Sequence, residues 1–512
     1  MLVKTYGSAV SGIHATTITI EVDVTAGIKF FLVGLPDNAV KESEQRIRAA
    51  LQNNGYRIPG KKIIINMAPA DIKKEGSSYD LPLAIGILAA SGQMKSEIIS
   101  DYVIMGELSL DGSLHHIKGA LPIAIKAREE GFKGIILPKE NAREAAIVND
   151  LEVLGVENIK ELIDFFNGDS EIEKTEIDTR AEFYSALNNN IPDFSDVKGQ
   201  ENIKRALEIA AAGGHNVIMI GPPGSGKTML AKRMSGILPP LTLQEALETT
   251  KIHSVAGRLS ANNTLMTSRP FRSPHHTISD VALVGGGVNP QPGEISLSHN
   301  GVLFLDELPE FKRTVLEVMR QPLEDRVVTI SRAKSTVDYP ASFMLVSSMN
   351  PCPCGYYNHP EKDCLCPPGM VQKYLNKISG PLLDRIDLHV EVTTVSFSEL
   401  SSKEKGESSK DIREKVILSR EIQEKRFSAS DKTYSNSHMN SKHIQKFCIL
   451  DSESSDMLKT AMEKLDLSAR AYDRILKVSR TIADLAASEN IQSQHIAEAI
   501  QYRSLDREGW AG

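Results

Sequence analysis

The sequence predicts an α/β fold, in which short buried strands alternate with helices and the chain ends in a helical region. The apolar runs Val217–Ile220 and Val302–Leu305 each indicate a buried strand, and a helical pattern follows the first of them. From Lys442 onward, small apolar residues recur at helical spacing. These three observations define the expected fold class.

Residues 1–166 show the same alternation over a longer stretch. Thr17–Val24 has the period-two pattern of a half-buried strand, and Asp37 is the expected N-cap of a helix that runs to Leu51. Further strands are expected at Lys61–Met67, Tyr102–Met105 and Gly134–Leu137, and further helices at Leu81–Ala90, Gly119–Glu130 and Glu140–Ala146. We therefore expect a compact α/β domain here.

Length and composition limit the possible classes of protein. A chain of 512 residues is long enough for several domains, each with its own core. The net charge of −7 argues against a protein that coats nucleic acid with its whole surface, but it is compatible with a locally basic channel. The start resembles no signal peptide, and the apolar run Leu81–Ala90 is too short to span a bilayer. Five cysteines, four of them clustered, fit a reducing compartment, so we expect a cytoplasmic protein without membrane contact.

The stretch Val217–Thr228, VIMIGPPGSGKT, matches the phosphate-binding pattern G-x-x-x-x-G-K-[ST] between a strand and a helix. Glycines let successive N–H groups curl around a phosphate, and the helix N-terminus adds partial positive charge. Lys227 is expected to reach the β- and γ-phosphates of ATP, and the Thr228 hydroxyl to bind Mg²⁺. The expected nucleotide-binding residues are Gly221, Pro222, Pro223, Gly224, Ser225, Gly226, Lys227 and Thr228.

A second stretch, Gly301–Glu307 (GVLFLDE), supplies the complementary half of such a site. Its acidic residues follow a predicted strand, and ligand sites of open α/β sheets lie at the carboxyl ends of strands. We expect Asp306 to hold Mg²⁺ and Glu307 to polarise the attacking water. A strand that merely ends in acidic turn residues is the structural alternative.

A predicted hairpin carries the sequence's candidate contacts to nucleic acid. A helical run over residues 312–326 precedes two short strands, Val327–Ile330 and Ser335–Tyr339. The cations Arg326, Arg332 and Lys334 belong to this region, the last two at the tip. Phosphate contact requires only cations within reach, so a pore hairpin that touches a DNA backbone is one interpretation. A solvated loop is the other.

Four cysteines in the pattern C-x-C-x₉-C-x-C are candidate zinc ligands: Cys352, Cys354, Cys364 and Cys366. Two close thiol pairs can meet one tetrahedral Zn²⁺, although the spacing within each pair is tighter than the usual C-x₂₋₄-C. His359 is a spare ligand. Reduced packing cysteines and a redox-labile loop stay open as alternatives.

Two other features are interpreted as structural. The adjacent His275 and His276 cannot easily bind one ion together, and no carboxylate spacing supports a metal site there. Gly285–Gly287 is expected to permit a tight turn rather than to bind a second phosphate.

Parts of the N-terminal region resemble the proteolytic domain of Lon-type proteases, namely Gly106–Asn141 and Lys74–Leu88. Those enzymes use a Ser–Lys dyad. Local alignment puts Ser78 in the place of the nucleophile, but Leu121 in the place of the lysine, with Lys118 three residues too early. Because a serine hydroxyl without a base is a poor nucleophile, we expect a Lon-like fold that lacks peptidase activity and serves assembly or partner binding.

Two further stretches resemble AAA+ ATPases. Asp193–Gln200 and the helix after it are similar to the lead-in of an AAA+ module, although an ordinary capped helix fits the residues equally well. Arg269–Phe311 closely resembles the magnesium-chelatase-like branch, whose members carry an insertion in the second helix.

The AAA+ resemblance implies roles for three further residues. Asn350, at a strand end, corresponds to the sensor-1 residue that orients water, and Arg470 to sensor 2. Arg385 corresponds to an arginine finger that reaches a neighbouring subunit's ATP, with a salt bridge to Asp384 or Asp387 as the alternative. Two further arginines of the C-terminal region are expected to be solvated helix charges, Arg474 and Arg480.

Over nearly its whole length the chain resembles the ComM/YifB family of magnesium-chelatase-like ATPases. The resemblance implies a Lon-protease-like N-terminal domain (1–166), a linker (167–192), an AAA+ P-loop core with a helix-2 insertion (193–395), a hinge with a charged helix (396–440) and an α-helical lid (441–512).

The family implies homo-hexameric rings, ATP and Mg²⁺ as cofactors, branched or single-stranded DNA as substrate, and ATP-driven branch migration in natural transformation. The partner of the N-terminal domain is unknown. Three alternatives stay open: a chelatase motor for metal insertion into a tetrapyrrole, an ATP-dependent protease, and a scaffold without enzymatic activity.

Overall fold

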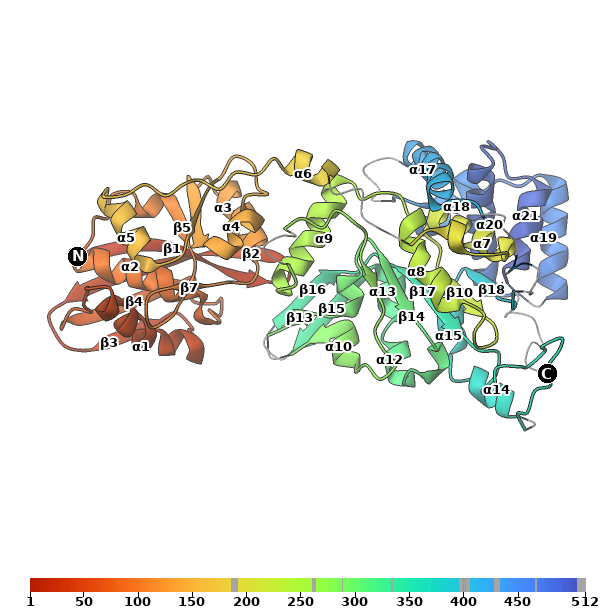
Figure 1. Ribbon diagram of the computed structural model, residues 1–512, viewed down its shortest axis with the longest axis horizontal. Helices are drawn as coiled ribbons and strands as arrows, with labels where there is room; N and C mark the ends of the chain where they lie inside the picture. Colours follow the sequence, from red (N-terminus) through yellow and green to blue (C-terminus); the bar gives the residue numbers. More distant parts are fainter. Residues whose placement is uncertain are drawn as a thin grey trace. The chain divides into compact units, whose positions relative to one another are not determined.

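The computed structural model describes residues 1–185, 192–259, 264–287, 289–332, 335–367, 369–395, 399, 401, 406–427, 433–465 and 467–503. The chain forms two compact units (Figure 1). The first contains Met1–Leu187 with Thr242–Thr267, and the second contains Asn188–Leu241 with Ser268–Gly512. Each has strands and helices, so the predicted α/β fold class is confirmed.

The first unit is built on a seven-stranded sheet, counted over the described residues, with the order β3-β4-β2-β1-β5-β8-β9. β1 and β2 form a long antiparallel hairpin, β4 pairs antiparallel with β2, and the other neighbours are parallel. The strands are β1 (Leu2–Ser11), β2 (His14–Thr25), β3 (Phe30–Val33), β4 (Lys62–Ala68), β5 (Tyr102–Ile104), β8 (Gly134–Pro138) and β9 (Glu152–Val156); β6 (Glu107–Leu108) and β7 (Leu114–His115) pair separately. The predicted alternation of β2 is confirmed, because Ile18, Ile20 and Val22 are fully buried.

Helices of the first unit lie close to their predicted bounds. The helices with predicted bounds are α1 (Asn38–Asn53), α2 (Asp80–Ala90), α3 (Ala120–Glu129) and α4 (Lys139–Ala145). Two further helices were not predicted, α5 (Ile159–Asn167) and α6 (Thr179–Ser185). Asp37 caps α1 as predicted, since its Oδ1 accepts the Val40 N–H at 2.8 Å. The α6 helix falls within residues 167–192, the stretch interpreted as a linker.

One helix of the first unit comes from far along the chain. This is α9 (Leu243–Val255), which begins with a capping box at Thr242 and Glu245. It packs on α3, where the Ser254 carbonyl accepts the Gly119 N–H at 3.2 Å and the Ser254 hydroxyl donates to Glu144. The α9 segment therefore joins the N-terminal domain by packing, although its sequence lies inside the stretch expected to form the ATPase core.

A parallel five-stranded sheet, again counted over the described residues, organises the second unit in the order β11-β14-β17-β10-β18. These strands are β11 (Phe271–Arg272), β14 (Val302–Leu305), β17 (Met344–Met349), β10 (Val217–Ile220) and β18 (Leu388–Glu391). β10, β14 and β17 are buried throughout, which explains their continuous apolar sequence. Two helices next to β10 in sequence are α7 (Glu201–Gly213) and α8 (Lys227–Ile237).

The C-terminal part of the second unit is helical, as predicted. It contains α17 (Ser409–Arg426), α18 (Ser441–Phe447), α19 (Ser452–Lys464), α20 (Ala469–Leu485) and α21 (Ser493–Gln501). α17 and α20 pack against α7, and Leu207, Ile475 and Ile482 belong to one buried cluster. The lid helices therefore share a core with the nucleotide-binding module.

Short elements fill the predicted insertion. They are α10 (Asp280–Val284), β12 (Gly285–Gly286), β13 (Gln291–Pro292) and α11 (Glu294–Leu297). Gly285, Gly286 and Gly287 all have positive φ, at 111°, 151° and 104°. A Cβ on Gly285 would lie 2.4 Å from the Gln291 carbonyl oxygen. The expected tight turn is confirmed, since only glycine fits there.

The predicted helix over residues 312–326 is instead two short helices, α12 (Arg313–Glu317) and α13 (Arg320–Asp325). Pro322 is the physical reason, because it has no N–H to donate to the carbonyl of Val318 and its ring crowds that carbonyl. The two predicted strands follow as the antiparallel pair β15 (Val327–Arg332) and β16 (Ser335–Pro340). Two further short helices are α14 (Met370–Leu375) and α15 (Gly380–Leu383).

Among the described residues, no helix combines the length and the apolar character that crossing a bilayer requires.

Candidate nucleotide site and cysteine cluster

The turn between β10 and α8 has the geometry that a phosphate-binding loop needs. Gly224 and Gly226 adopt left-handed conformations, with φ of 81° and 88°. A Cβ on Gly221 would lie 2.2 Å from the Val392 carbonyl oxygen, so glycine is required there by close packing. The turn leads directly into the N-terminus of α8, whose free N–H groups favour an anion.

Lys227 closes over this turn. Its Nζ donates to the carbonyl oxygens of Gly221 and Pro222, both at 2.8 Å. It also donates to Asn350 Oδ1 at 3.2 Å, which brings together the predicted phosphate ligand and the predicted sensor. Burial lowers the pKa of Lys227, although the nearby charges of Asp306 and Glu307 oppose that shift.

The predicted magnesium ligands meet directly. Thr228 Oγ1 donates to Asp306 Oδ2 at 2.6 Å. The hydroxyl of Ser348 donates to the other carboxylate oxygen of Asp306. We did not expect Ser348 from the sequence. The available signal was a polar Ser-Ser pair near the end of the apolar strand β17.

Glu307 has an unexpected partner, His276. Its backbone is left-handed, with φ of 54°, and its carboxylate Oε2 lies 3.4 Å from His276 Nδ1. The His276 ring also stacks near His275, with centroids 4.1 Å apart. The sequence analysis argued only against a metal site at these histidines and did not predict the contact with the predicted catalytic carboxylate.

Arg385 is held within its own chain. It is 9% exposed, one guanidinium nitrogen pairs with Glu324, and another donates to the Pro381 carbonyl at 2.5 Å. The alternative prediction, a salt bridge from Arg385 to Asp384 or Asp387, is therefore wrong, because Arg385 pairs with Glu324. Asp384 and Asp387 bind arginines of α20 instead.

Arg470 and Arg474 lie one turn apart on α20 and differ in environment. Arg470 is exposed and pairs with Asp384 at 3.3 Å. Arg474 is largely buried and pairs with Asp387 at 2.9 Å. Arg480 is also buried and pairs with Asp484. The expectation that Arg474 and Arg480 are solvated was wrong, because both are counter-ions of buried carboxylates.

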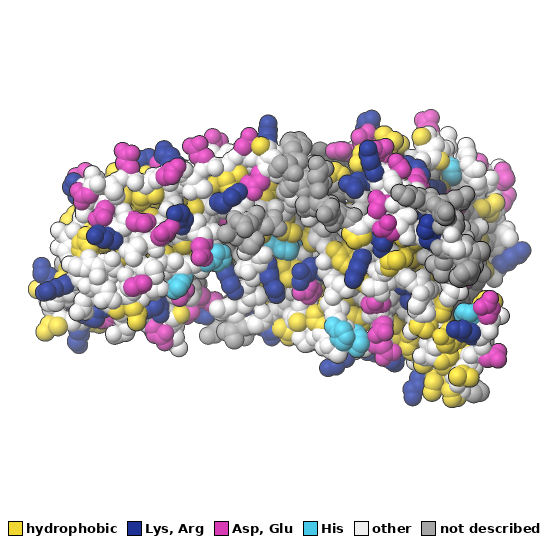
Figure 2. Space-filling view, viewed as in Figure 1, with side chains coloured by type: hydrophobic (Ala, Val, Ile, Leu, Met, Phe, Trp, Pro, Cys, Tyr) yellow, Lys and Arg dark blue, Asp and Glu magenta, His cyan; other side chains and the backbone are white. Residues whose placement is uncertain are grey.

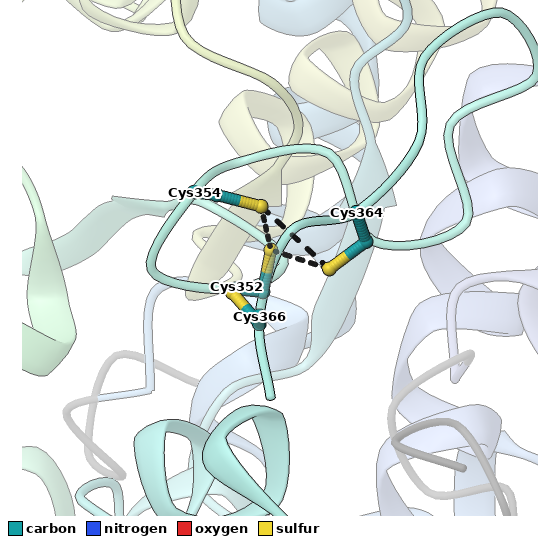
Figure 3. A group of neighbouring side chains, drawn as sticks. All are labelled: Cys352, Cys354, Cys364 and Cys366. Carbon is teal, nitrogen blue, oxygen red and sulfur yellow. Dashed lines mark hydrogen bonds between the residues drawn. The ribbon is translucent and has the colours of Figure 1, made fainter. Parts of the chain in front are cut away.

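The four predicted zinc ligands come together at one point (Figure 3). The sulfur atom of Cys352 lies 3.3 Å from that of Cys354 and 3.7 Å from that of Cys364, and all four sulfurs lie within 4.8 Å of one another. Four thiolates at about 2.3 Å from a tetrahedral zinc ion are about 3.8 Å apart, so the cluster fits this metal. His359 is not part of the cluster, and its Nδ1 accepts the Glu361 N–H at 3.1 Å.

Hydrophobic side chains gather on the surface of the second unit where α14 lies (Figure 2). Leu365, in the cysteine loop, is 84% exposed, and Met370, the first residue of α14, is 43% exposed. Exposed apolar side chains of this kind are typical of interaction surfaces.

Comparison with known proteins agrees with this geometry. Residues 193–400 match the family described as "Magnesium chelatase, subunit ChlI", residues 406–503 its "subunit ChlI C-terminal", and residues 20–141 the family "Subunit ChlI of Mg-chelatase". The chain is 46% identical over 508 residues to "Competence protein ComM" of Haemophilus influenzae, covering 98% of this chain and 97% of that protein. It is 45% identical over 506 residues to "Uncharacterized protein YifB" of Escherichia coli, covering 98% and 96%.

This chain belongs to the ComM/YifB family of magnesium-chelatase-like AAA+ proteins. Membership implies ATPase activity with ATP and Mg²⁺ as cofactors. The family's Lon-like character is also seen, since the chain is 32% identical over 154 residues to "Lon protease 2" of Bacillus subtilis, covering 27% of this chain and 26% of that protein.

In this ComM/YifB member, the residues aligned with the Lon dyad do not form one. Ser78 lies in a short turn before α2, whereas Leu121 is fully buried within α3 and offers no base. Lys118 lies along Gly257, where a Cβ would be 2.9 Å from the lysine Cε. Loss of peptidase activity stays a prediction.

The basic hairpin of this family member is only partly described. Arg332 ends β15 and is exposed, and a Cβ on Gly286 would lie 3.1 Å from its guanidinium. Lys334 lies outside the described residues. Arg326 lies at the base of the hairpin, as the left-handed C-cap of α13. Burial and the nearby Arg474 lower the pKa of Arg326 to about 10.

Proposed function

We propose that this protein is an ATP-driven hexameric ring motor that acts on DNA, as a branch-migration helicase in natural transformation or recombination. The contact of Thr228 with Asp306 beside Lys227 carries the motor part of this proposal. These groups can hold Mg²⁺–ATP, with Glu307 placed to activate water. The similarity to a protein named for competence supports the DNA part.

In the proposed hexameric ring, three residues have roles in ATP hydrolysis. Arg385 acts as the arginine finger, Asn350 as sensor 1 and Arg470 as sensor 2. Arg385 must then leave Glu324 to reach a neighbour's nucleotide. The exposed Leu365 and Met370 supply an apolar surface for a neighbouring subunit.

The first unit serves assembly or partner binding rather than proteolysis. The absence of a base at Leu121 supports this role. Its edge strand β3 also exposes apolar side chains, since Phe31 and Val33 are 41% and 51% exposed. The partner that covers this edge is unknown.

We further infer that Cys352, Cys354, Cys364 and Cys366 bind one Zn²⁺. The convergence of four thiol sulfurs supports a closed structural site.

A magnesium-chelatase-type motor that acts on a partner protein for metal insertion is the second candidate. The family descriptions over residues 193–400 and 406–503 favour it. In that case the ATPase responds to a protein and not to DNA.

The deciding experiment measures ATP turnover without DNA, with linear duplex and with branched DNA. We expect branched DNA to stimulate turnover and the Glu307→Gln variant to show neither basal nor stimulated activity. Turnover that ignores every DNA would contradict the DNA motor and favour the chelatase-type motor.

A variant of the hairpin tip tests the DNA contact. Changing Arg332 and Lys334 to Ala should weaken DNA binding, lower the salt slope by about one unit per lost phosphate contact and abolish DNA stimulation. Basal turnover should survive. The control changes two exposed lysines of α19, Lys459 and Lys464, to Ala, which removes the same charge elsewhere. Equal effects of the two double variants would refute a specific role for the tip.

A further inference from the structure

The cysteine cluster begins where the phosphate-binding loop is anchored. β17 runs parallel to β10, and the Gly221 N–H donates to the Met349 carbonyl at 3.2 Å. The next residue, Asn350, accepts from Lys227 Nζ. The first thiol, Cys352, follows two residues later and is fully buried. Only two residues therefore separate the contact with the phosphate-binding loop, at Met349, from the first cysteine of the cluster.

The cysteine loop, residues 351–366, then packs back on the phosphate-binding loop. Gly355 has φ of 87°, and a Cβ there would lie 2.5 Å from the Pro223 Cδ atom. The Gly355 N–H donates to the Cys352 sulfur at 3.2 Å, as backbone groups around metal thiolates do. One residue thus contacts both the candidate metal ligand and the phosphate-binding turn.

The two loops also share a cavity of about 220 Å³. Its walls are Gly221 and Pro222 of the phosphate-binding loop, residues 357–360 of the cysteine loop, and residues 391–394 at the end of β18. It lies at the carboxyl ends of parallel strands, where α/β proteins bind ligands. The cysteine loop is therefore part of the wall beside the nucleotide site.

The described residues of this loop form no helix or strand, so no ladder of backbone hydrogen bonds holds them in place. Ordering a long segment costs conformational entropy. A metal that joins both thiol pairs offsets this cost, because a structural zinc site contributes folding free energy directly.

We propose that a zinc ion on Cys352, Cys354, Cys364 and Cys366 holds the cysteine loop against the phosphate-binding loop, and that nucleotide affinity therefore depends on this metal. The inference rests on the ATP-binding and zinc-binding parts of the proposed function and is independent of DNA.

The first test uses the full chain, purified without added zinc. Elemental analysis should find about one zinc per chain and no stoichiometric iron. The affinity for a fluorescent ATP analogue is measured before and after a zinc-selective chelator, with Mg²⁺ held constant, and again after zinc is restored. We expect metal removal to weaken binding at least about tenfold, reversibly. Absence of zinc, or metal-free protein with unchanged affinity, would overturn the proposal.

The second test distinguishes loss of the metal from displacement of the cysteine loop. Gly355→Ala keeps all four thiols but pushes a methyl group against Pro223, so zinc content should stay near one while nucleotide affinity falls. Gly369→Ala is the control, since Gly369 has a similar φ of 78° and no atom within 4 Å of an added Cβ. Unchanged affinity in a zinc-loaded Gly355→Ala protein would overturn the coupling.

Thiol variants complete the design. Changing Cys364 and Cys366 to Ser should remove zinc and weaken nucleotide binding, whereas Cys448→Ser, at a buried cysteine outside the cluster, should do neither. Because no DNA is present, failure here leaves the DNA motor standing, and a protein that ignores DNA leaves this inference standing.

Discussion

Lys227 shows how a single side chain is prepared for its ligand. Its ammonium group is buried and donates hydrogen bonds to two carbonyl oxygens of the phosphate-binding turn. Burial lowers its pKa, so the free site disfavours the charge that a phosphate would stabilise. A bound phosphate would add negative charge to that of Asp306 and Glu307, which already opposes the lowering of this pKa.

We expect Lys227→Ala to abolish productive nucleotide binding. Glu307→Gln should keep ATP affinity near that of the parent but stall hydrolysis, because it retains the shape of the side chain and removes the charge that activates water. Binding of a fluorescent nucleotide and steady-state turnover, measured in parallel, check both. Near-normal turnover of Glu307→Gln would remove its assignment.

His276 contacts Glu307, which no motif indicated. The contact at 3.4 Å joins an imidazole to a carboxylate that is 57% exposed, so the pair contributes at most about 1 kcal/mol. We hypothesise that this contact restrains Glu307 in the nucleotide-free chain, so that the carboxylate activates water only after the contact breaks.

We predict that His276→Ala raises DNA-free turnover by up to about fivefold, with ATP affinity unchanged. His275→Ala is the matched control, because that ring bonds to Thr277 instead. A fall in turnover specific to His276→Ala would show that His276 positions Glu307 for catalysis rather than restraining it.

At the scale of elements, Asp387 joins the sheet to the lid. It lies just before β18 and is 1% exposed, and it binds His215, two residues beyond the end of α7, and Arg474 on α20. Burial opposes ionisation of Asp387, but Arg474 and His215 outweigh it and hold its pKa well below the usual range. A buried carboxylate thus fixes where the lid helix meets the strand.

We expect Asp387→Asn to lower the free energy of unfolding by about 3 kcal/mol, since it leaves buried Arg474 without its counter-charge. Asp384→Asn, which breaks the exposed pair with Arg470, should cost at most about 1 kcal/mol. Because folding lowers the pKa of Asp387, its contribution is present above the unfolded pKa of about 3.9 and is lost as pH falls below it. Chemical denaturation from pH 7 downward measures both effects. Equal losses in the two variants would contradict this role.

At the scale of the whole molecule, the proposed ring predicts that a neighbouring chain completes the nucleotide site. Arg385 is bound to Glu324, and the described residues around Glu307 include no arginine paired with it. Catalysis by a ring would exchange the Glu324 contact for a neighbour's phosphate. Helix α9 belongs to the first unit, although α8, which precedes it in sequence, belongs to the second. The chain therefore passes between the two units more than once.

We expect Arg385→Ala to leave ATP affinity almost intact and to lower turnover at least about 10²-fold. Mixing Arg385→Ala with Lys227→Ala should recover some activity, because an intact finger then faces an intact site across a shared interface. Turnover of each variant alone and of their mixtures measures this. An unchanged rate in Arg385→Ala would remove the finger, and no recovery in any mixture would place its action within one chain.

The nucleotide motif could be read from the sequence because its parts are consecutive. A strand, a glycine turn and a helix start occupy Val217–Thr228, and each conformation follows from local preferences. The same holds for the cap at Asp37 and for the glycine turn at Gly285. The break between α12 and α13 also has a local cause, because Pro322 lacks the N–H of a helical hydrogen bond, although one continuous helix was predicted there.

Pairings between distant residues could be decided only by the tertiary structure. Arg385 binds Glu324 rather than its neighbours, Glu307 meets His276, and α9 packs on the first unit. Local spacing carries no information on these contacts, because they depend on which elements the sheet order brings together. The cysteine pattern identified four candidate ligands, but their convergence beside the phosphate-binding loop follows from β17 lying next to β10.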